Sequence, residues 1–235
     1  MIRMLVIREL GSRKPTFVVS TGDGNFEFDV VSAFAKKYDG RGLLWFPKIP
    51  EAGMRIIGRG RAAGGEVKGL PAYRIVNTYP GKYGISSFVF LMDAEHVKSA
   101  EDVLNYFSEE LRVRNLRLQE FEEGAFLIEG SVGAHKVRVH TAVLGETKCI
   151  EENVARLVEI ELKIPIDVEG MRSRSEGKEF KKLLRKAVME ALRRRRLSVK
   201  DLIDRASVES LERAFPSLSR IFKIVEKESL ASGDS

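Results

Sequence analysis

The feature that most constrains the fold is an apolar run at residues 87–92 that stops abruptly at two carboxylates, Asp93 and Glu95. A capping-box-like pattern at residues 99–102 then opens a helix whose apolar face includes Val103 and Phe107. In an α/β protein, a buried strand of this kind delivers acidic side chains to the carboxyl edge of the sheet. The segment therefore predicts a buried strand with a candidate site at its end.

Other patterns place this strand in a parallel sheet. A short strand is predicted at residues 16–20, a helix pattern runs up to Tyr38, and another strand is predicted at residues 43–46. This strand–helix–strand order favours parallel strands joined by a right-handed crossover. Further strands are predicted at residues 73–77, before turn residues 80–84, and as a hairpin at residues 125–129 and 137–144.

The character of the chain changes towards its C-terminal part. A helix pattern at residues 150–162 is ended by Pro165, and residues 172–176 read as a linker. Three helices are then predicted: a long one over residues 180–192, a second capped by Ser198, and a third after Pro216.

The fold class predicted from these elements is α/β, with a Rossmann-like, mostly parallel sheet and helices on both faces over residues 1–168. A basic helical extension follows at residues 172–230, and a polar tail at residues 231–235. The segment 47–69, rich in Gly, Arg and Pro, is predicted to be an irregular loop.

Composition limits the classes of protein. The chain has no apolar run near the roughly 18 residues that a membrane span needs, so a cytoplasmic protein without membrane contact is expected. Its one cysteine, Cys149, excludes an internal disulfide and cannot alone form a zinc site. Charged residues make up 31% of the chain and Gln119 is its only glutamine, a bias typical of thermophilic proteins.

The net charge of +6 is concentrated in one segment. Residues 172–196 contain eleven Lys or Arg against three Glu, a balance of +8, so the remainder sums to −2. Lys and Arg give salt-sensitive affinity for phosphate backbones, which predicts a nucleic-acid contact here. A solvated helix, or a helix that packs on a protein partner or a second copy of the chain, remains an alternative. The candidate nucleic-acid-binding residues are Lys181, Lys182, Arg185, Lys186, Arg193, Arg194, Arg195 and Arg196.

The acidic pair is a candidate metal site. Asp93 and Glu95 are two residues apart, so both project to the same side if the strand continues. Two carboxylates at a strand end suit Mg²⁺ or Mn²⁺, which add phosphate and water oxygens to a few protein ligands. The alternative is a solvated acidic cluster that interacts favourably with a helix dipole.

The turn at residues 21–25 is a candidate phosphate site. Gly22 and Gly24 follow a predicted strand and precede a helix, where free backbone N–H groups can bind a phosphate. The turn carries no Walker motif, and an ordinary turn with glycine at positive φ is the alternative.

An apolar strand followed by Asp-x-Glu and a helix, after another strand–turn–helix unit, resembles the Toprim domain of primases, topoisomerases and related nucleases. The resemblance covers residues 15–145 and implies a compact Rossmann-like fold that binds divalent metal and handles phosphodiester bonds. Asp93 and Glu95 then occupy the second acidic motif. Where the first motif places Glu-Gly, this chain has Thr21-Gly22. Asp23, Glu27 and Asp29 are the candidates for the missing carboxylate, and the alternative is a Toprim-like fold without the standard catalysis.

Two functions follow from these candidates. In the first, Asp93 and Glu95 act as catalytic residues and, with Asp23 or Glu27, hold Mg²⁺ or Mn²⁺ for phosphodiester chemistry on nucleic acid. In the second, the same α/β unit is a non-catalytic module that binds a nucleotide or nucleic acid. The absent first-motif glutamate favours the second.

Overall fold

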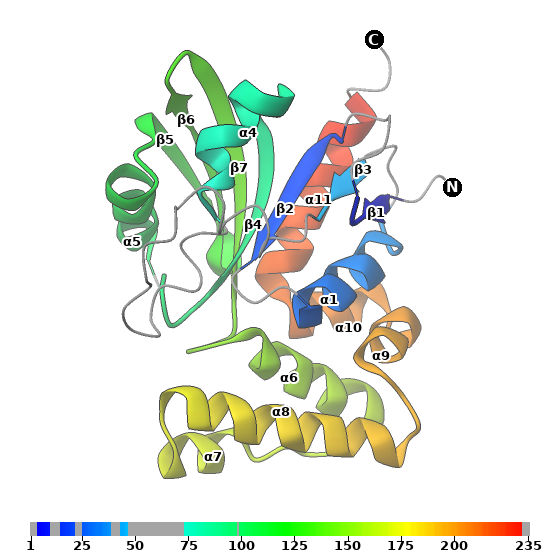
Figure 1. Ribbon diagram of the computed structural model, residues 1–235. Helices are drawn as coiled ribbons and strands as arrows, with labels where there is room; N and C mark the ends of the chain where they lie inside the picture. The colour runs from blue at the N-terminus through cyan, green and yellow to red at the C-terminus, as the bar shows by residue number, and fades with distance from the viewer. Residues whose placement is uncertain are drawn as a thin grey trace.

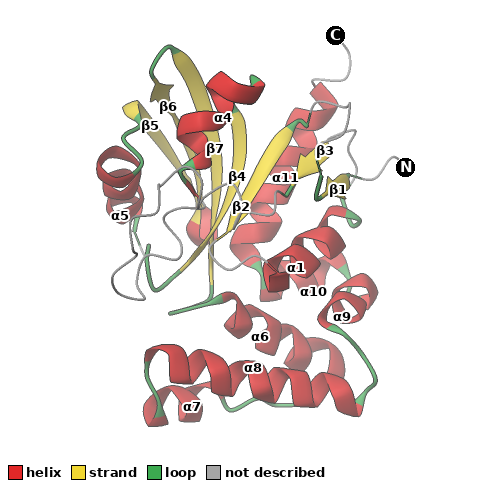
Figure 2. Ribbon diagram, viewed as in Figure 1, coloured by secondary structure: helices red, strands yellow, loops and turns green. Residues whose placement is uncertain are grey.

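A computed structural model describes residues 4–9, 15–21, 25–38, 43–46, 73–97 and 99–231. Within these residues, seven strands form one mixed sheet of order β1-β3-β2-β4-β7-β6-β5 (Figures 1 and 2). The first five strands in this order are parallel, and β6 and β5 add antiparallel pairs at one edge. The predicted α/β class with a mostly parallel sheet is confirmed. The strands are β1 Leu5–Ile7, β2 Phe17–Thr21, β3 Leu43–Trp45, β4 Ser87–Asp93, β5 Arg114–Phe121, β6 Ala125–Val132 and β7 His135–Leu144.

The helices lie on both faces of this sheet and beyond its carboxyl edge (Figure 1). Short π and 3-10 turns, η1 Tyr106–Glu110 and η2 Glu122–Gly124, flank β5. The helices are α1 Asn25–Ala35, α4 Ile75–Tyr83, α5 Ala100–Asn105, α6 Ile150–Leu162, α7 Val168–Arg174, α8 Gly177–Arg194, α9 Val199–Arg205, α10 Val208–Ala214 and α11 Pro216–Ala231.

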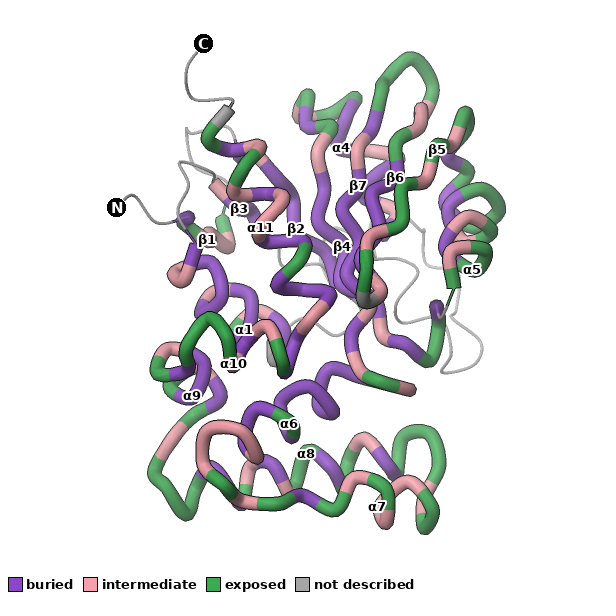
Figure 3. Tube along the Cα trace, turned by 180° about the vertical axis from the view of Figure 1, so that it is seen from behind, coloured by how far each residue is buried: buried purple, intermediate pink, exposed green. Residues whose placement is uncertain are grey.

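Alternation along the central strands separates two hydrophobic cores. In β4, Val89 and Leu91 pack on the face that α1 and α11 cover, while Phe88 and Phe90 pack on the face of α4 and α5. Figure 3 shows β2 and β4 buried along nearly their whole lengths, whereas β5 is largely exposed and the outer half of β6 is mostly of intermediate burial. A strand buried on both faces reads as a continuous apolar run, which explains the sequence of β4.

Helix α11 packs back on the sheet. Ser217 at its start donates a hydrogen bond to the carbonyl of Val143 in β7 (2.5 Å), and Phe222 lies against Phe34 of α1 (ring centroids 5.7 Å apart). The hydrophobic core is therefore continuous between the α/β part and the C-terminal helices. The boundary at residues 168–172 stays a prediction, but the helices after it supply one covering layer of the sheet.

The predicted strand at residues 73–77 is wrong, because Ile75–Tyr83 is helical. Ile75, Val76 and Tyr79 are buried at helical spacing, and the indole of Trp45 stacks on the ring of Tyr79 (5.2 Å). Pro80 lies inside the helix, and Gly84 ends it in the left-handed conformation (φ 63°), donating its N–H to the carbonyl of Pro80 (3.0 Å). The turn residues therefore mark a helix end.

Two other element predictions need correction, and two strands were missed. Residues 172–176 are not a plain linker, since α7 extends to Arg174 and is capped by Asp167, which accepts a hydrogen bond from the Gly170 N–H (2.8 Å). The second C-terminal helix is two helices, α9 and α10, each capped by a serine. Strands β1 and β5 were not predicted. The predicted loop 47–69 and the tail residues 232–235 lie outside the described residues.

Candidate functional site at the carboxyl edge

The acidic pair converges on one lysine. Asp93 ends β4 and Glu95 lies in the turn after it, and their carboxylates accept hydrogen bonds from the same ammonium group, Nζ of Lys181. The distances are 2.7 Å from Nζ to Asp93 Oδ2 and 2.6 Å to Glu95 Oε1. The two carboxylates converge through the turn and not along a continued strand as expected, and a cation from α8 lies between them. We call Asp93, Glu95 and Lys181 the carboxyl-edge cluster.

Backbone hydrogen bonds fix the turn that carries the acids. The N–H of Ala94 donates to the carbonyl of Leu144 (2.9 Å), and the N–H of Glu95 donates to the carbonyl of Lys148 (3.2 Å). The turn after β4 is therefore tied to the loop between β7 and α6. Both loops leave the carboxyl ends of adjacent parallel strands, where α/β proteins usually build their sites.

The loop between β7 and α6 is itself held by Glu152. Its carboxylate accepts from the N–H groups of Thr147 (2.9 Å) and Lys148 (3.0 Å) and from Arg172 of α7 (3.0 Å). Burial raises the pKa of Glu152, but these hydrogen bonds outweigh burial, so its pKa is lowered. At Gly145 (φ 87°), a Cβ atom would lie 2.4 Å from the N atom of Cys149, so only glycine fits.

The electrostatics of the carboxyl-edge cluster are dominated by burial. Burial raises the pKa of Asp93 to about 6, against the charge and hydrogen bond of Lys181, which lower it; the negative charges of Glu151 and Glu95 add to the rise. Burial lowers the pKa of Lys181, but Asp93 and Glu95 outweigh it, so its pKa is raised. Lys181 is therefore protonated at neutral pH. Asp93, with its pKa of about 6, titrates only slightly below neutral pH.

Two buried residues of α6 and its cap lie beside the cluster. Glu151 is buried and acts on Asp93 through its charge. Burial raises the pKa of the Cys149 thiol far above its usual range, and the charge of Glu151 raises it further. Cys149 is therefore a neutral thiol and no activated nucleophile. Sequence reasoning could not place Glu151 at the site, because nothing local indicates which residue of α6 faces β4.

Of the remaining candidates for metal and phosphate, the structure describes only Glu27 and Asp29, both in α1. Glu27 is a buried residue in the first turn of α1, and Asp23, Gly22 and Gly24 lie outside the described residues. Among the described residues, no three His, Cys, Asp or Glu side chains form a group that could hold a metal ion. Within the described residues, the metal hypothesis therefore depends on Asp93 and Glu95.

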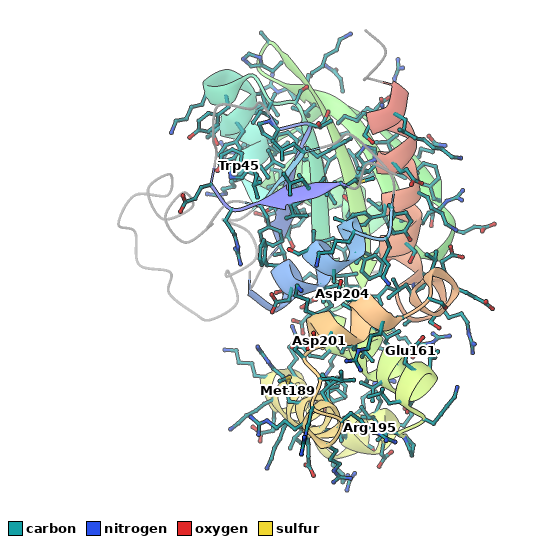
Figure 4. All side chains as sticks on the ribbon, turned by 90° about the vertical axis from the view of Figure 1, so that its right-hand side faces the viewer. Trp45, Glu161, Met189, Arg195, Asp201 and Asp204 are labelled. Atoms are coloured by element: carbon teal, nitrogen blue, oxygen red, sulfur yellow. The ribbon has the colours of Figure 1, made fainter. Side chains whose placement is uncertain are left out.

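Helix α8 turns its apolar side to α6 and its basic side to solvent. Phe180, Leu184 and Val188 are buried, whereas the candidate cations other than Lys181 are exposed. Arg194 pairs with Glu190 (2.6 Å). In the described part of the chain, the side chains of five others form no hydrogen bond or ion pair, and we call these five the α8 basic face: Lys182, Lys186, Arg193, Arg195 and Arg196. Figure 4 shows Arg195 on the helices beyond the carboxyl edge of the sheet.

Comparison with known proteins gives no match: neither a family model, nor a curated protein, nor a solved structure is significantly similar to the chain. Among the described residues, no helix is both long enough and apolar enough to cross a membrane.

Proposed function

We propose that this protein binds nucleic acid through the α8 basic face. The observation that carries the proposal is the contrast between neighbouring cations of one helix. Lys181 and Arg194 are neutralised by carboxylates, whereas Lys182, Lys186 and Arg193 project into solvent with no partner in the described part of the chain. Lys and Arg that are free to contact phosphates displace condensed counterions from nucleic acid, which supplies affinity without sequence preference.

The clustering of like charges also supports a polyanion partner. A solvated helix gains solubility from mixed charges, and like charges that lie close together repel each other. Arg193, Arg195 and Arg196 lie within four consecutive residues at the end of α8, and all are exposed. Their repulsion is relieved when phosphates bind between them.

The test is binding of labelled single- and double-stranded DNA and RNA, measured by fluorescence anisotropy over a salt series. The variant Lys182→Gln/Lys186→Gln/Arg193→Gln removes three cations. We expect weaker binding to duplex DNA and a slope of log K against log salt that falls by up to about 3. The matched control Lys36→Gln/Lys200→Gln/Lys223→Gln also removes three charges, from residues that pair with Asp204 and Glu212. Equal losses in both variants, or no loss in the first, would overturn the proposal.

A second candidate function is Toprim-like, metal-dependent phosphodiester chemistry at the carboxyl-edge cluster. What supports it is that Asp93 and Glu95 already converge on a single cation at the edge of the sheet that α8 adjoins. Mg²⁺ or Mn²⁺ prefers such oxygens and would complete its shell with water and phosphate. A bound metal would orient a water molecule and stabilise charge at the scissile phosphate. Asp93 and Glu95 would hold it, and Lys181, displaced from between them, would be free to contact a phosphate.

Metal binding by the purified protein tests this candidate. Lys181→Met removes the resident cation, so we expect tighter Mn²⁺ binding by calorimetry than in the wild type. Asp93→Ala/Glu95→Ala should abolish that binding, and unchanged affinity in the double variant would remove the metal claim. Incubating nucleic acid with the protein and either Mn²⁺ or EDTA then separates the two functions. Metal-dependent cleavage supports the enzyme, and binding that EDTA leaves intact supports the binding module alone.

A further inference from the structure

A polar cavity lies on the sheet face far from Asp93. Its volume is about 530 Å³, and its lining includes Ser87, Arg117, Glu129, Ser131, Lys136 and Arg138. Ser87 begins β4 and Asp93 ends it, so about 20 Å of strand separates this cavity from the carboxyl-edge cluster. The volume falls in the range of roughly 300–1,000 Å³ that is usual for small-molecule sites. We call it the sheet-face pocket.

Strand register brings the lining residues together. Ser87 pairs with Arg138, Arg138 with Glu129, and Glu129 with Arg117, so one row of side chains crosses four strands on the same face. Lys136 and Ser131 form the next row. Helix α11 covers the same face at His140 and ends near Arg138, which leaves this corner of the sheet open (Figure 3).

The lining carries surplus positive charge. It contains three cations, Arg117, Lys136 and Arg138, and one carboxylate, Glu129; Arg138 pairs with Glu129 (3.5 Å) and with Glu228 of α11 (2.9 Å), so the surplus charge rests on Arg117 and Lys136. The side chains of Arg117 and Lys136 are exposed and form no ion pair or hydrogen bond within the described parts of the chain. The rest of the lining is largely hydroxyl and amide groups, which are hydrogen-bond donors as well as acceptors.

Arg138 is held in place from behind. Its Nη2 atom lies 2.9 Å from Glu228 Oε1 of α11, and Glu228 Oε2 lies 3.0 Å from Nε2 of the fully buried His140. Burial raises the pKa of Glu228, but the hydrogen bond with His140 and the charge of Arg138 outweigh it, so its pKa is lowered and it stays ionised. A guanidinium oriented by a fixed carboxylate loses little entropy when it binds a ligand.

From this geometry we propose that the sheet-face pocket binds a phosphorylated small molecule of about nucleotide size. Arg117, Lys136 and Arg138 would hold the phosphate, because guanidinium and ammonium groups form charge-assisted hydrogen bonds with phosphoryl oxygens. The hydroxyls of Ser87 and Ser131 would contact the polar body of the ligand. Glu228 is a positioning residue that acts through Arg138. The site is distinct from the α8 basic face and does not depend on it.

Calorimetric titration with pyrophosphate, ATP and ribose 5-phosphate tests the proposal. We expect at least one to bind, and Arg117→Gln/Lys136→Gln to weaken that binding by at least about tenfold. Neither residue has a partner in the described structure, so the fold should survive, and an unchanged melting temperature checks this. Lys200→Gln/Lys223→Gln, which also removes two cations but from residues assigned to no binding surface, is the matched control and should bind as the wild type does.

Three results would overturn the proposal. The first is that no phosphorylated ligand binds, and the second is that Arg117→Gln/Lys136→Gln binds as tightly as the wild type. The third is that this variant loses nucleic-acid binding as the α8 variant does, while small ligands stay unbound, which would make the pocket part of a nucleic-acid surface.

A double-mutant cycle tests the positioning role. Glu228→Gln should weaken ligand binding in the wild type but have no further effect once Arg138→Gln is present. An equal loss in both backgrounds would contradict the role assigned to Glu228.

Discussion

The carboxyl-edge cluster and the sheet-face pocket place the same types of charged residue at two ends of one sheet, with opposite outcomes. At the carboxyl edge, Lys181 lies between Asp93 and Glu95, so its charge is neutralised within the molecule. The two ion pairs hold α8 against the strand ends. In the pocket, Arg117 and Lys136 face solvent, and only Arg138 is paired. Composition alone therefore does not tell which cations are neutralised within the molecule; the carboxylates that the fold brings to each of them decide it, and in the pocket they reach Arg138 but neither Arg117 nor Lys136.

Of the substitutions that test this contrast, removal of Lys181 should change the free energy of unfolding most. Lys181→Met leaves Asp93, Glu95 and Glu151 as partly buried negative charges without a counter-ion. We expect the free energy of unfolding to fall by about 3 kcal/mol at pH 8, reduced from the upper range for buried pairs because the three charged side chains of the cluster are about one-quarter exposed. Urea denaturation measures it. Lys182→Met, one residue along the helix, is the control and should change the value by less than about 0.5 kcal/mol.

Replacing Asp93 should change how stability depends on pH. The pKa of Asp93 in the folded protein, about 6, lies above its ordinary value of 3.8, so ionising it costs stability between those values. The free energy of unfolding of the wild type, relative to Asp93→Asn, should therefore fall as the pH rises from 4 to 8. The expected fall is about 2 kcal/mol after allowance for solvent screening. Parallel pH profiles of the two proteins would contradict a raised pKa.

The pKa of Asp93 is a direct measure of its contact with Lys181. Because Lys181 lowers the pKa of Asp93 through its charge and its hydrogen bond, Lys181→Met should move that pKa above its wild-type value of about 6. Titration of the side-chain carboxyl carbon by NMR measures it. A pKa that stays constant or falls would show that α8 does not sit on the acidic pair in solution.

The pocket cations should give the smallest effect on stability. Arg117→Gln and Lys136→Gln should each change the free energy of unfolding by less than about 0.5 kcal/mol, since neither side chain has a partner in the described structure. Equilibrium unfolding in urea measures both. A loss of more than about 1 kcal/mol would show that these cations are structural, and the contrast with Lys181 would disappear.

Local patterns predicted the part of the carboxyl-edge site that is local. The apolar run marks a strand that is buried on both faces and ends at Asp93, whereas Glu95 reaches the same cation through a turn that strand alternation does not predict. The role of Lys181 was out of reach, because 88 residues separate it from Asp93 and only tertiary packing joins them. Its placement among the cations expected to bind nucleic acid followed from charge alone, which does not report the partner.

Turn chemistry caused the clearest error. Pro80 and Gly84 are typical turn residues, so the segment before them was predicted as a strand. The buried residues Ile75, Val76 and Tyr79 are in fact spaced as on a helix. The pocket was missed for a different reason. Leu116 and Leu118 alternate with Arg117 in the sequence, which is a strand signal, but the pairing of Arg117 with Glu129 depends on the register of β5 with β6. No local pattern fixes that register.

Because α11 packs on strands made much earlier in the chain, covering of the sheet by this helix is delayed during synthesis. Ser217 and Val143, which its first turn joins, are 74 residues apart in the chain, and the pair His140–Glu228 is 88 apart. A ribosome that adds 5–20 residues per second needs roughly 4–15 s to make the first of these intervals. For that time one face of β7 has no covering helix, and the apolar side chains meant for the core are open to chaperones or to another chain.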